Sequence, residues 1–309
     1  MVYNNFFKLC LFSYFLSWTT TMANTPYKIR DFETVRLKST AGAGVGSMLL
    51  NESAVLNPAT VAFFNFSTFY IQREQSEMAN TGDREWAENQ FNDESGNTAL
   101  IIADATNPNM KGTMAYTTQQ EGTEKRKRVS AAFGKPIGKK SSIGMLYRYT
   151  IENSLLDGED ADSQKFHQLS MGAFHAIEDN LTIGIVANDI AKQRTGESKV
   201  IAGGQYFYRD IIALIFDFGI DPYAETMSDN FLYKGAVQLN FFSDLYLRGG
   251  VFTDKIDRVR GNGIGLGWVG PKLVIDFAFK NSKPMSDDSP LLRSGETLKD
   301  TGLSLTYKF

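Results

Sequence analysis

The feature that most constrains the fold of this chain is an alternation of apolar and polar side chains with a period of two. In the segment 142–151, Ile143, Met145 and Tyr147 fall on one face of an extended chain, whereas Arg148 falls on the other. This period is typical of β-strands with two unlike faces. Comparable segments recur about fourteen times, most of them about 9 to 12 residues long, as tilted membrane strands require. They span 66–75, 97–104, 110–119, 126–136, 141–151, 164–177, 180–189, 197–208, 211–220, 230–241, 244–253, 261–269, 271–280 and 300–309.

The connections between these segments alternate in length. Ser76–Gly96, Glu152–Ser163 and Asn281–Lys299 are long, whereas Glu178–Asp179 and Gly270 are very short. No long helical pattern separates the strands, which excludes parallel crossover units. Outer-membrane barrels have short turns at the periplasmic end and longer loops at the outer end. We therefore predict an all-β fold, an antiparallel transmembrane β-barrel of about fourteen strands formed by residues 66–309.

The charges of the alternating segments share one face, and the opposite face is apolar. The charged face carries Arg148, Asp217, Lys234, Arg248 and Asp276. Because a charge is very costly against lipid, we expect these side chains to line the lumen. A large soluble β-domain, the alternative fold, would place its apolar face inside. We expect the lumenal charges to pair with one another or with a segment inside the barrel; the alternative is a polar permeation path.

The composition limits the possible functions. The chain has 32 Lys and Arg against 35 Asp and Glu, a formal net charge of -3. It has no basic field, so we expect no nucleic-acid partner. The only histidines, His167 and His175, fall on the outward face, and the only cysteine is Cys10. We therefore expect no enzyme activity, no metal site and no cofactor.

Residues 1–23 have the pattern of a secretory signal peptide. Lys8 is followed by the apolar run Leu9–Trp18 and then by small or neutral residues, with Thr21 and Ala23 before the expected cleavage point. The alternative is an N-terminal membrane anchor. The apolar run is about half the length needed to span a bilayer, which favours cleavage.

Residues 24–65 show no strand pattern and precede the first strand. Asn57 followed by Pro58 predicts a short helix to about Phe64, with Asn as the cap and Pro in the first turn. This segment also holds a glycine run, Gly42, Gly44 and Gly46. The run lacks the spacing of a dinucleotide fingerprint, so tight packing in a confined space is favoured over phosphate binding.

The order of these features resembles that of the FadL-type outer-membrane proteins, which carry long-chain fatty acids and other hydrophobic compounds. It also resembles the wider PorV-like relatives associated with protein export. In that family the N-terminal segment is a plug, or hatch, inside the barrel, and an Asn-Pro-Ala stretch lies in it. The residues that match this plug motif are Gly42, Gly44, Gly46, Asn57, Pro58 and Ala59.

The resemblance implies an outer-membrane barrel for passive transport of hydrophobic or amphipathic small molecules, gated by the plug at residues 24–65. Met48, Leu49 and Leu50 are the plug residues expected to contact such a ligand. Two alternatives remain open. The barrel could be a scaffold or shuttle for a secreted or surface protein, or a structural barrel with a sealed lumen.

The end of the chain resembles the C-terminal signature of bacterial outer-membrane barrels, with Tyr307 and Phe309 as the residues that the barrel-assembly machinery would read. Outer-membrane lipids and lipopolysaccharide are then expected partners. Lys125–Arg128 is interpreted either as a contact for lipopolysaccharide phosphates or as a solvated hairpin end. An acidic cluster is interpreted either as a divalent cation site or as a solvated loop, and comprises Asp157, Glu159, Asp160 and Asp162.

Overall fold

The computed structural model describes residues 29–79, 95–107, 110–121, 124–156, 159–194, 196–224, 230–242, 244–285, 289, 292 and 296–309. The predicted signal peptide, plug residues 24–28 and the side chains of the acidic cluster at 157–162 lie outside what is described.

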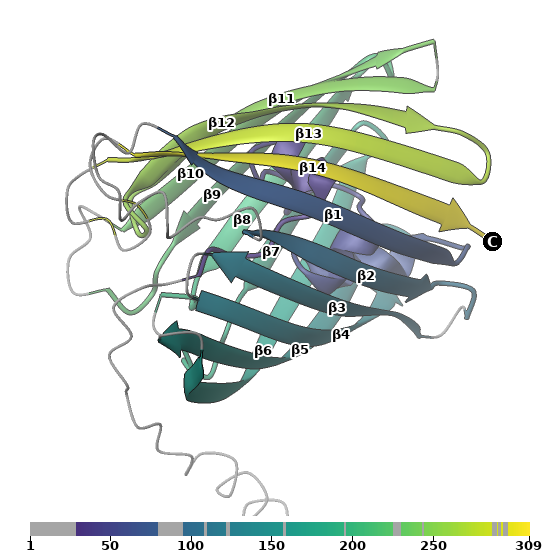
Figure 1. The fold of residues 1–309 in the computed structure, drawn as a ribbon. Coiled ribbons are helices and arrows are strands. Elements are labelled where there is room, and N and C mark those ends of the chain that lie inside the picture. The colour runs from purple at the N-terminus through teal and green to yellow at the C-terminus, as the bar shows by residue number, and fades with distance from the viewer. Residues whose placement is uncertain are drawn as a thin grey trace, which may run out of the picture.

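The strands are β1 Thr68–Ala79, β2 Gly96–Asp104, β3 Lys111–Glu121, β4 Glu124–Ile137, β5 Ser141–Leu156, β6 Glu159–Glu178, β7 Leu181–Ala187, β8 Val200–Tyr208, β9 Ile212–Ile220, β10 Phe231–Phe241, β11 Leu245–Asp254, β12 Val259–Val269, β13 Leu273–Pro284 and β14 Thr297–Lys308. Each strand pairs with its neighbours in sequence, and β1 pairs antiparallel with β14, which closes the barrel (Figure 1). The predicted antiparallel barrel of about fourteen strands is confirmed.

The two ends of the barrel differ in their connections. Ser67 and Phe309 exchange two backbone hydrogen bonds of 3.2 and 3.0 Å, so the barrel begins and ends at the same rim. The turn between β6 and β7 at that rim is Asp179–Asn180. Short turns face the periplasm in outer-membrane barrels, so we assign this rim, marked C in Figure 1, to the periplasm. The opposite rim is the outer end.

The exterior is apolar and the interior is polar, as the alternation predicts. Phe216 and Val251 on the exterior are 57% and 63% exposed, whereas Thr150 and Ser170 are buried in the lumen. A soluble barrel has the opposite arrangement. Tyr307 is the last outward side chain of β14, and its ring stacks on that of Phe309, just after the strand, with the ring centres 6.3 Å apart at the periplasmic rim.

The structure differs from the prediction at the β5–β6 hairpin. The segment 152–163 was expected to be a long outer loop, but the two strands continue their pairing as far as Leu156 and Glu159. In a membrane barrel, an alternation of apolar and polar residues marks a strand where one of its faces meets lipid. Apart from Leu155, Leu156 and Ala161, the residues of 152–163 are polar or glycine at both alternate sets of positions, so the hairpin continues without that signal.

The described part of the plug, residues 29–65, lies inside the barrel and contains three short helices, α2 (Val35–Ser39), η1 (Asn51–Ala54) and η2 (Pro58–Phe63). The helix predicted from Pro58 is present as the 3-10 helix η2. The plug contacts the outer end of the lumen near Ile29 and the periplasmic end at η2, from which the chain enters β1. No helix among the described residues is long and apolar enough to cross a membrane.

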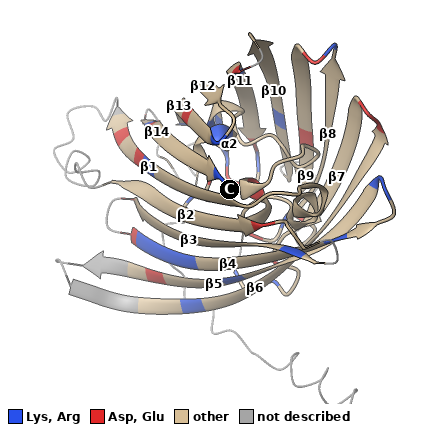
Figure 2. Cartoon of the chain, turned by 90° about the vertical axis from the view of Figure 1, so that its right-hand side faces the viewer, with Lys and Arg blue, Asp and Glu red and all other residues tan. Residues whose placement is uncertain are grey.

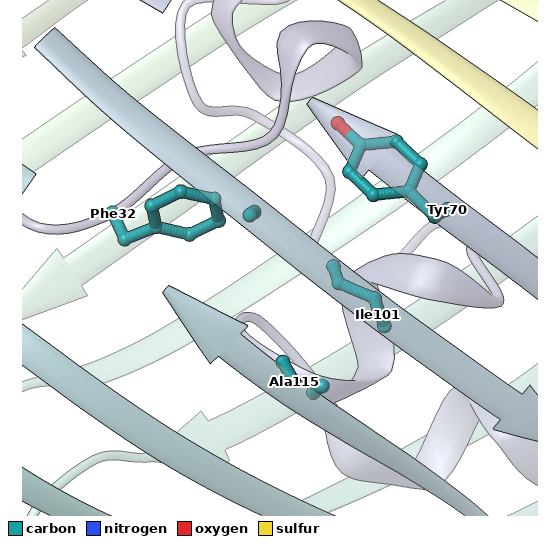
Figure 3. Packing of buried hydrophobic residues seen from close by; sticks show 6 residues of the cluster. Phe32, Tyr70, Ile101 and Ala115 are labelled. Atoms are coloured by element: carbon teal, nitrogen blue, oxygen red, sulfur yellow. The ribbon is translucent and has the colours of Figure 1, made fainter. Parts of the chain in front are cut away.

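Some apolar side chains of the wall also point inward, and the plug packs against several of them. Figure 3 shows Phe32 of the plug beside Tyr70, Ile101 and Ala115 of the first three strands. These side chains are buried, so the plug has its own small cores with the wall.

An arginine placed on the apolar exterior should destabilise the barrel. Phe216 is the central residue of β9, so we expect Phe216→Arg to lower the free energy of unfolding by about 2 to 4 kcal/mol. Phe242→Arg, in a short periplasmic turn where the side chain is 93% exposed, should cost about 0 to 1 kcal/mol. Urea titration of both variants in lipid vesicles measures the difference. Equal costs would contradict the assignment of the exterior to lipid.

Candidate functional site: the junction of plug and barrel wall

Asn57 joins the two halves of the plug to each other and to the wall. Its side-chain oxygen accepts from the backbone N–H of Ala59 at 3.1 Å, which caps η2. Its side-chain nitrogen donates to the carbonyl of Val45 at 2.9 Å and to that of Ala173 in β6 at 3.2 Å. One amide therefore fixes the start of η2, the glycine run and a wall strand together.

Three glycines leave the backbone of the wall bare where η2 approaches it most closely. Gly134, Gly144 and Gly172 are direct register partners on β4, β5 and β6. A Cβ on Gly144 would overlap the carbonyl carbon of Pro58, and one on Gly172 would overlap the side chain of Asn57. The close approach of two backbones requires glycine at these wall positions.

A second set of wall glycines lies under α2, across the lumen from the first. It consists of Gly250, Gly263 and Gly265 on β11 and β12. A Cβ on Gly263 would overlap the carbonyl of Lys38, and one on Gly265 would lie 2.5 Å from the side chain of Ser39. We call the two sets together the wall glycines. The plug is thus seated on bare backbone at both sides of the barrel.

The glycine run of the plug is held by side chains of the wall. The carboxylate of Asp217 accepts from the backbone N–H groups of Gly44 at 2.8 Å and Val45 at 3.1 Å. The hydroxyl of Thr182 donates to the carbonyl of Gly46 at 2.6 Å. A Cβ on Gly46 would lie 2.5 Å from the carbonyl oxygen of wall Gly203, so this glycine too marks a close approach.

At Gly42, the backbone conformation also favours glycine. Gly42 follows α2 with φ +81°, in the left-handed region that favours glycine, and its N–H bonds the carbonyl of Leu37 at 2.6 Å. Ala41 before it, with φ +54°, is also left-handed, so the chain leaves α2 through two such residues, and position 42 is the one where glycine removes the strain.

All five charges predicted for the lumen lie inside it. Arg148 donates to the carbonyl of Val55 in the plug at 2.9 Å, and Lys234 donates to that of Gly42 at 3.2 Å. Together with Asp217, they hold the plug backbone. Arg248 and Asp276 instead pair with each other on the wall at 2.5 Å. The lumenal charges therefore use both kinds of partner that were expected: some bind the plug, and others pair with one another.

The sequence alone did not reveal a layer of ion pairs at the outer end of the plug. Arg30 contacts Asp300 of β14 at 2.6 Å, and Lys38 contacts Asp300 at 3.2 Å and Glu74 of β1 at 2.8 Å. Figure 2 shows basic residues on and near α2 with acidic residues on the surrounding strands. Glu74 lies two residues from Gln72 on β1, and Asp300 lies four residues from Ser304 on β14, so each falls on the inward face of its strand. This alternation is the sequence feature from which their position in the lumen could have been predicted.

Glu33 of the plug is also paired, with Lys280 of β13 at 2.6 Å. Burial on its own would raise the pKa of Glu33. The ammonium groups of Lys280, Lys234 and Lys38 outweigh that effect and lower the pKa to about 2. Glu33 is therefore a carboxylate at any physiological pH.

The outer loop between β7 and β8 folds into the lumen and carries Glu197. This carboxylate meets the guanidinium groups of Arg126 at 3.0 Å, Arg128 at 2.9 Å and Arg194 at 3.3 Å. Burial opposes ionisation of Glu197, but the three arginines lower its pKa well below its usual range. The loop therefore closes over the outer end of the plug and is tied to β4.

Arg126 and Arg128 correct one interpretation of the sequence. Both were assigned to the surface segment Lys125–Arg128, but their side chains are buried in the lumen. They share the inward parity of Ser130, and only Lys127 of this group is fully outward. The assignment treated the segment as a hairpin end, whereas β4 already begins at Glu124.

The three plug residues expected to contact a ligand have different surroundings. Leu49 and Leu50 are buried, and Leu50 packs with Val61 of η2 and Ala103 of β2. Met48 between Ser47 and Leu49 is 44% exposed. Leu49 and Leu50 thus belong to the closed plug, and a ligand would reach them only after the plug moved.

The plug leaves small cavities in the lumen. One, of about 60 Å³, is lined in part by Phe32, Arg148 and Glu197, and another, of about 70 Å³, by Lys199, Phe252 and Lys280. An apolar cavity that binds benzene has a volume of about 150 Å³. Both cavities are smaller than that, so neither has room for a molecule of this size in this arrangement.

The comparisons with known proteins give a structural likeness. No family model and no curated protein matches the chain. The solved structure of the CymD monoaromatic hydrocarbon channel is similar, with a TM-score of 0.66 and 13% identity over 88% of this chain and 96% of that one. The Pseudomonas putida toluene transporter TodX is similar with a TM-score of 0.63 and 8% identity, over 92% of this chain and 99% of that one. At these identities the likeness shows a shared fold, the fold that the sequence resemblance implies.

Removal of the Asp217 carboxylate should loosen the glycine run. Hydrogen bonds to a charged group each contribute about 1.5 to 3 kcal/mol, so we expect Asp217→Ala to speed hydrogen exchange at Gly44 and Val45 by at least about tenfold. Exchange in the strands should be unchanged. Asp104→Ala, which removes an exposed carboxylate from the periplasmic end of β2, is the control. Equal protection in both variants would show that Asp217 does not hold the plug.

The contribution of Glu33 to the attachment of the outer plug should depend on pH only in acid. The pKa of Glu33 is lowered by folding from 4.5 to about 2, so its ion pair stabilises the docked plug fully above about pH 4.5. This contribution is lost as the pH falls from there toward 2. Protease cleavage near Arg30 should therefore increase as the pH falls below 4.5, and Glu33 should contribute nothing to any change between pH 8 and 5. In Glu33→Gln the increase should be smaller, and an unchanged acid response would rule out Glu33 as its source.

Proposed function

We propose that this protein is an outer-membrane channel for passive transport of hydrophobic or amphipathic small molecules, gated by its N-terminal plug. The observation that carries the proposal is the plug itself, which closes a complete barrel and rests on bare backbone through noncovalent contacts. The likeness to the CymD and TodX channels over almost the whole chain supports a monoaromatic hydrocarbon as the solute. The sequence resemblance supports a fatty-acid-like molecule as the alternative.

Movement of the plug would uncover an apolar surface for such a solute. Val45 of the plug packs against Val186, Ile201 and Leu232 of the wall, with Leu56 beside them. These buried contacts are separate from the ion pairs at the outer end of the plug. A hydrophobic molecule that replaced Val45 there would regain the burial that the plug had lost. The same patch therefore serves the plug in the closed state and the solute in the open one.

Passive transport requires no energy source in this scheme. The plug is held by hydrogen bonds and ion pairs, each of which contributes modestly to stability. Opening would then be a shift between two docked arrangements rather than an unfolding of the barrel. The solute would cross down its own concentration gradient.

A disulfide between plug and wall should stop transport. The hydroxyl oxygens of Ser53 in η1 and Thr113 in β3 are 2.9 Å apart, so Ser53→Cys with Thr113→Cys places two thiols within bonding reach. We expect the oxidised variant to reduce toluene uptake by whole cells to the level of cells without the protein. A reductant should restore the uptake.

The chain provides a matched control on the exterior. The hydroxyl oxygens of Thr98 in β2 and Thr118 in β3 are 2.6 Å apart, so Thr98→Cys with Thr118→Cys joins two wall strands and leaves the plug free. This variant should transport equally well when oxidised and reduced. If the plug disulfide forms and uptake persists, the gate is not the plug, and a scaffold or a structural barrel with a sealed lumen becomes the better explanation.

A further inference from the structure

The exterior of strands β1 to β4 carries a sharp polar boundary at its outer end. Arg73, Thr98, Thr118 and Lys127 are consecutive register partners across these four strands, and all face outward. One outward position closer to the periplasm, the same strands present Ile71, Leu100, Tyr116 and Val129, all exposed and apolar. The change from apolar to cationic and hydroxyl side chains therefore occurs within one row, as expected where acyl chains meet headgroups.

An apolar groove lies directly below this row. It has a volume of about 440 Å³, and Arg73 and Thr98 lie among its lining residues. Its apolar walls are formed by Ile71, Leu100, Tyr116, Leu303 and Leu305. Strands β14, β1, β2 and β3 that form it are neighbours on the near side of the barrel in Figure 1.

The two cations of the row have no acidic partner. Within the described residues, neither Arg73 nor Lys127 forms an ion pair. The acids Glu74 and Glu121 of β1 and β3 point into the lumen, where Lys38 and Arg30 of the plug engage them. The next outward row toward the outer end adds Gln75, Gln120 and Lys125, and no acid. The outward cations are therefore not neutralised by neighbouring acids, whereas Glu74 and Glu121 inside the lumen are paired.

The row has the spacing of a ligand with two separated anionic groups. Neighbouring strands lie about 4.8 Å apart, so Arg73 and Lys127 are roughly 14 Å apart at their backbones. The hydroxyls of Thr98 and Thr118 lie between them and hydrogen bond to each other at 2.6 Å. Both phosphates of a diphosphorylated sugar headgroup could contact a guanidinium or ammonium group, with the sugar over the two hydroxyls.

We propose that the outer face of β1 to β4 is a binding site for lipopolysaccharide. Arg73 and Lys127 bind the phosphates of its lipid A, and the groove at Ile71, Leu100 and Tyr116 holds an acyl chain. The outer position of the row selects a lipid of the outer leaflet. This proposal is independent of transport, since none of its side chains touches the plug.

The test compares charge removal at the two ends of the barrel. Arg73→Gln with Lys127→Gln removes two outward cations at the outer end. Lys135→Gln with Lys272→Gln removes two exposed cations at the periplasmic end and is the control for net charge. Purified proteins are titrated with lipid A in detergent, and bound lipid is counted by native mass spectrometry. Heat-resistant mobility on gels checks that each barrel is folded.

Loss of charge-assisted hydrogen bonds should weaken lipid A binding by at least about tenfold in the outer-end variant. The periplasmic-end variant should bind as the wild type does. Dephosphorylated lipid A should bind the wild type as weakly as lipid A binds the outer-end variant. Unchanged lipid A binding in the outer-end variant would overturn the proposal. Equally tight binding of phosphatidylglycerol to the wild type would also overturn it, because the site would then not be specific for lipopolysaccharide.

Discussion

The close approach of two backbones, that of the plug and that of the wall, is the constraint on which the rest of the structure depends. A lumen of this kind is narrow, and ordinary side chains on the wall would fill it. Glycines such as Gly144 and Gly263 leave room for a peptide chain to lie against the strands. Once the plug lies there, its own N–H and C=O groups are buried and require partners. Asp217, Thr182 and Arg148 supply those partners from the wall.

The ion pairs of the outer layer follow from the same arrangement. Charged side chains that face a filled lumen lose water, so each requires an opposite charge or several hydrogen bonds nearby. Buried ion pairs of this kind add little net stability compared with apolar packing. Their effect is to fix the position of the plug, because Arg30, Lys38 and Glu33 each meet an oppositely charged side chain of the wall. The outer half of the plug is therefore fixed by charge, and the half at η2 by shape.

The sequence predicts the parts of this structure that depend on one strand at a time. Alternation along a strand assigns each side chain to the lumen or the lipid, so the inward positions of Arg148 and Asp217 follow from parity alone. The same alternation places Arg126 inward. However, the run of four basic residues Lys125–Arg128 resembles a solvated turn if the end of the strand is expected within it. Pairings such as Lys38 with Glu74 depend on the register between distant segments, which alternation does not encode. The helix α2 is only five residues long, too short for a helical pattern to reveal it.

The division of the plug into a charged half and an apolar half has a consequence for gating. A solute shifts a conformational equilibrium only by binding one state better than the other. A hydrophobic molecule gains nothing at Glu33 or Lys38, so it cannot release the outer half of the plug. At Val45 and Leu56 it competes with the plug for Val186, Ile201 and Leu232, and its affinity for that patch exists only when the plug is displaced. Solute binding would therefore favour movement of the inner half around an outer half that stays fixed. The residues that decide opening are then those that hold the glycine run, Asp217 and Asn57, rather than the more numerous ion pairs at the outer end.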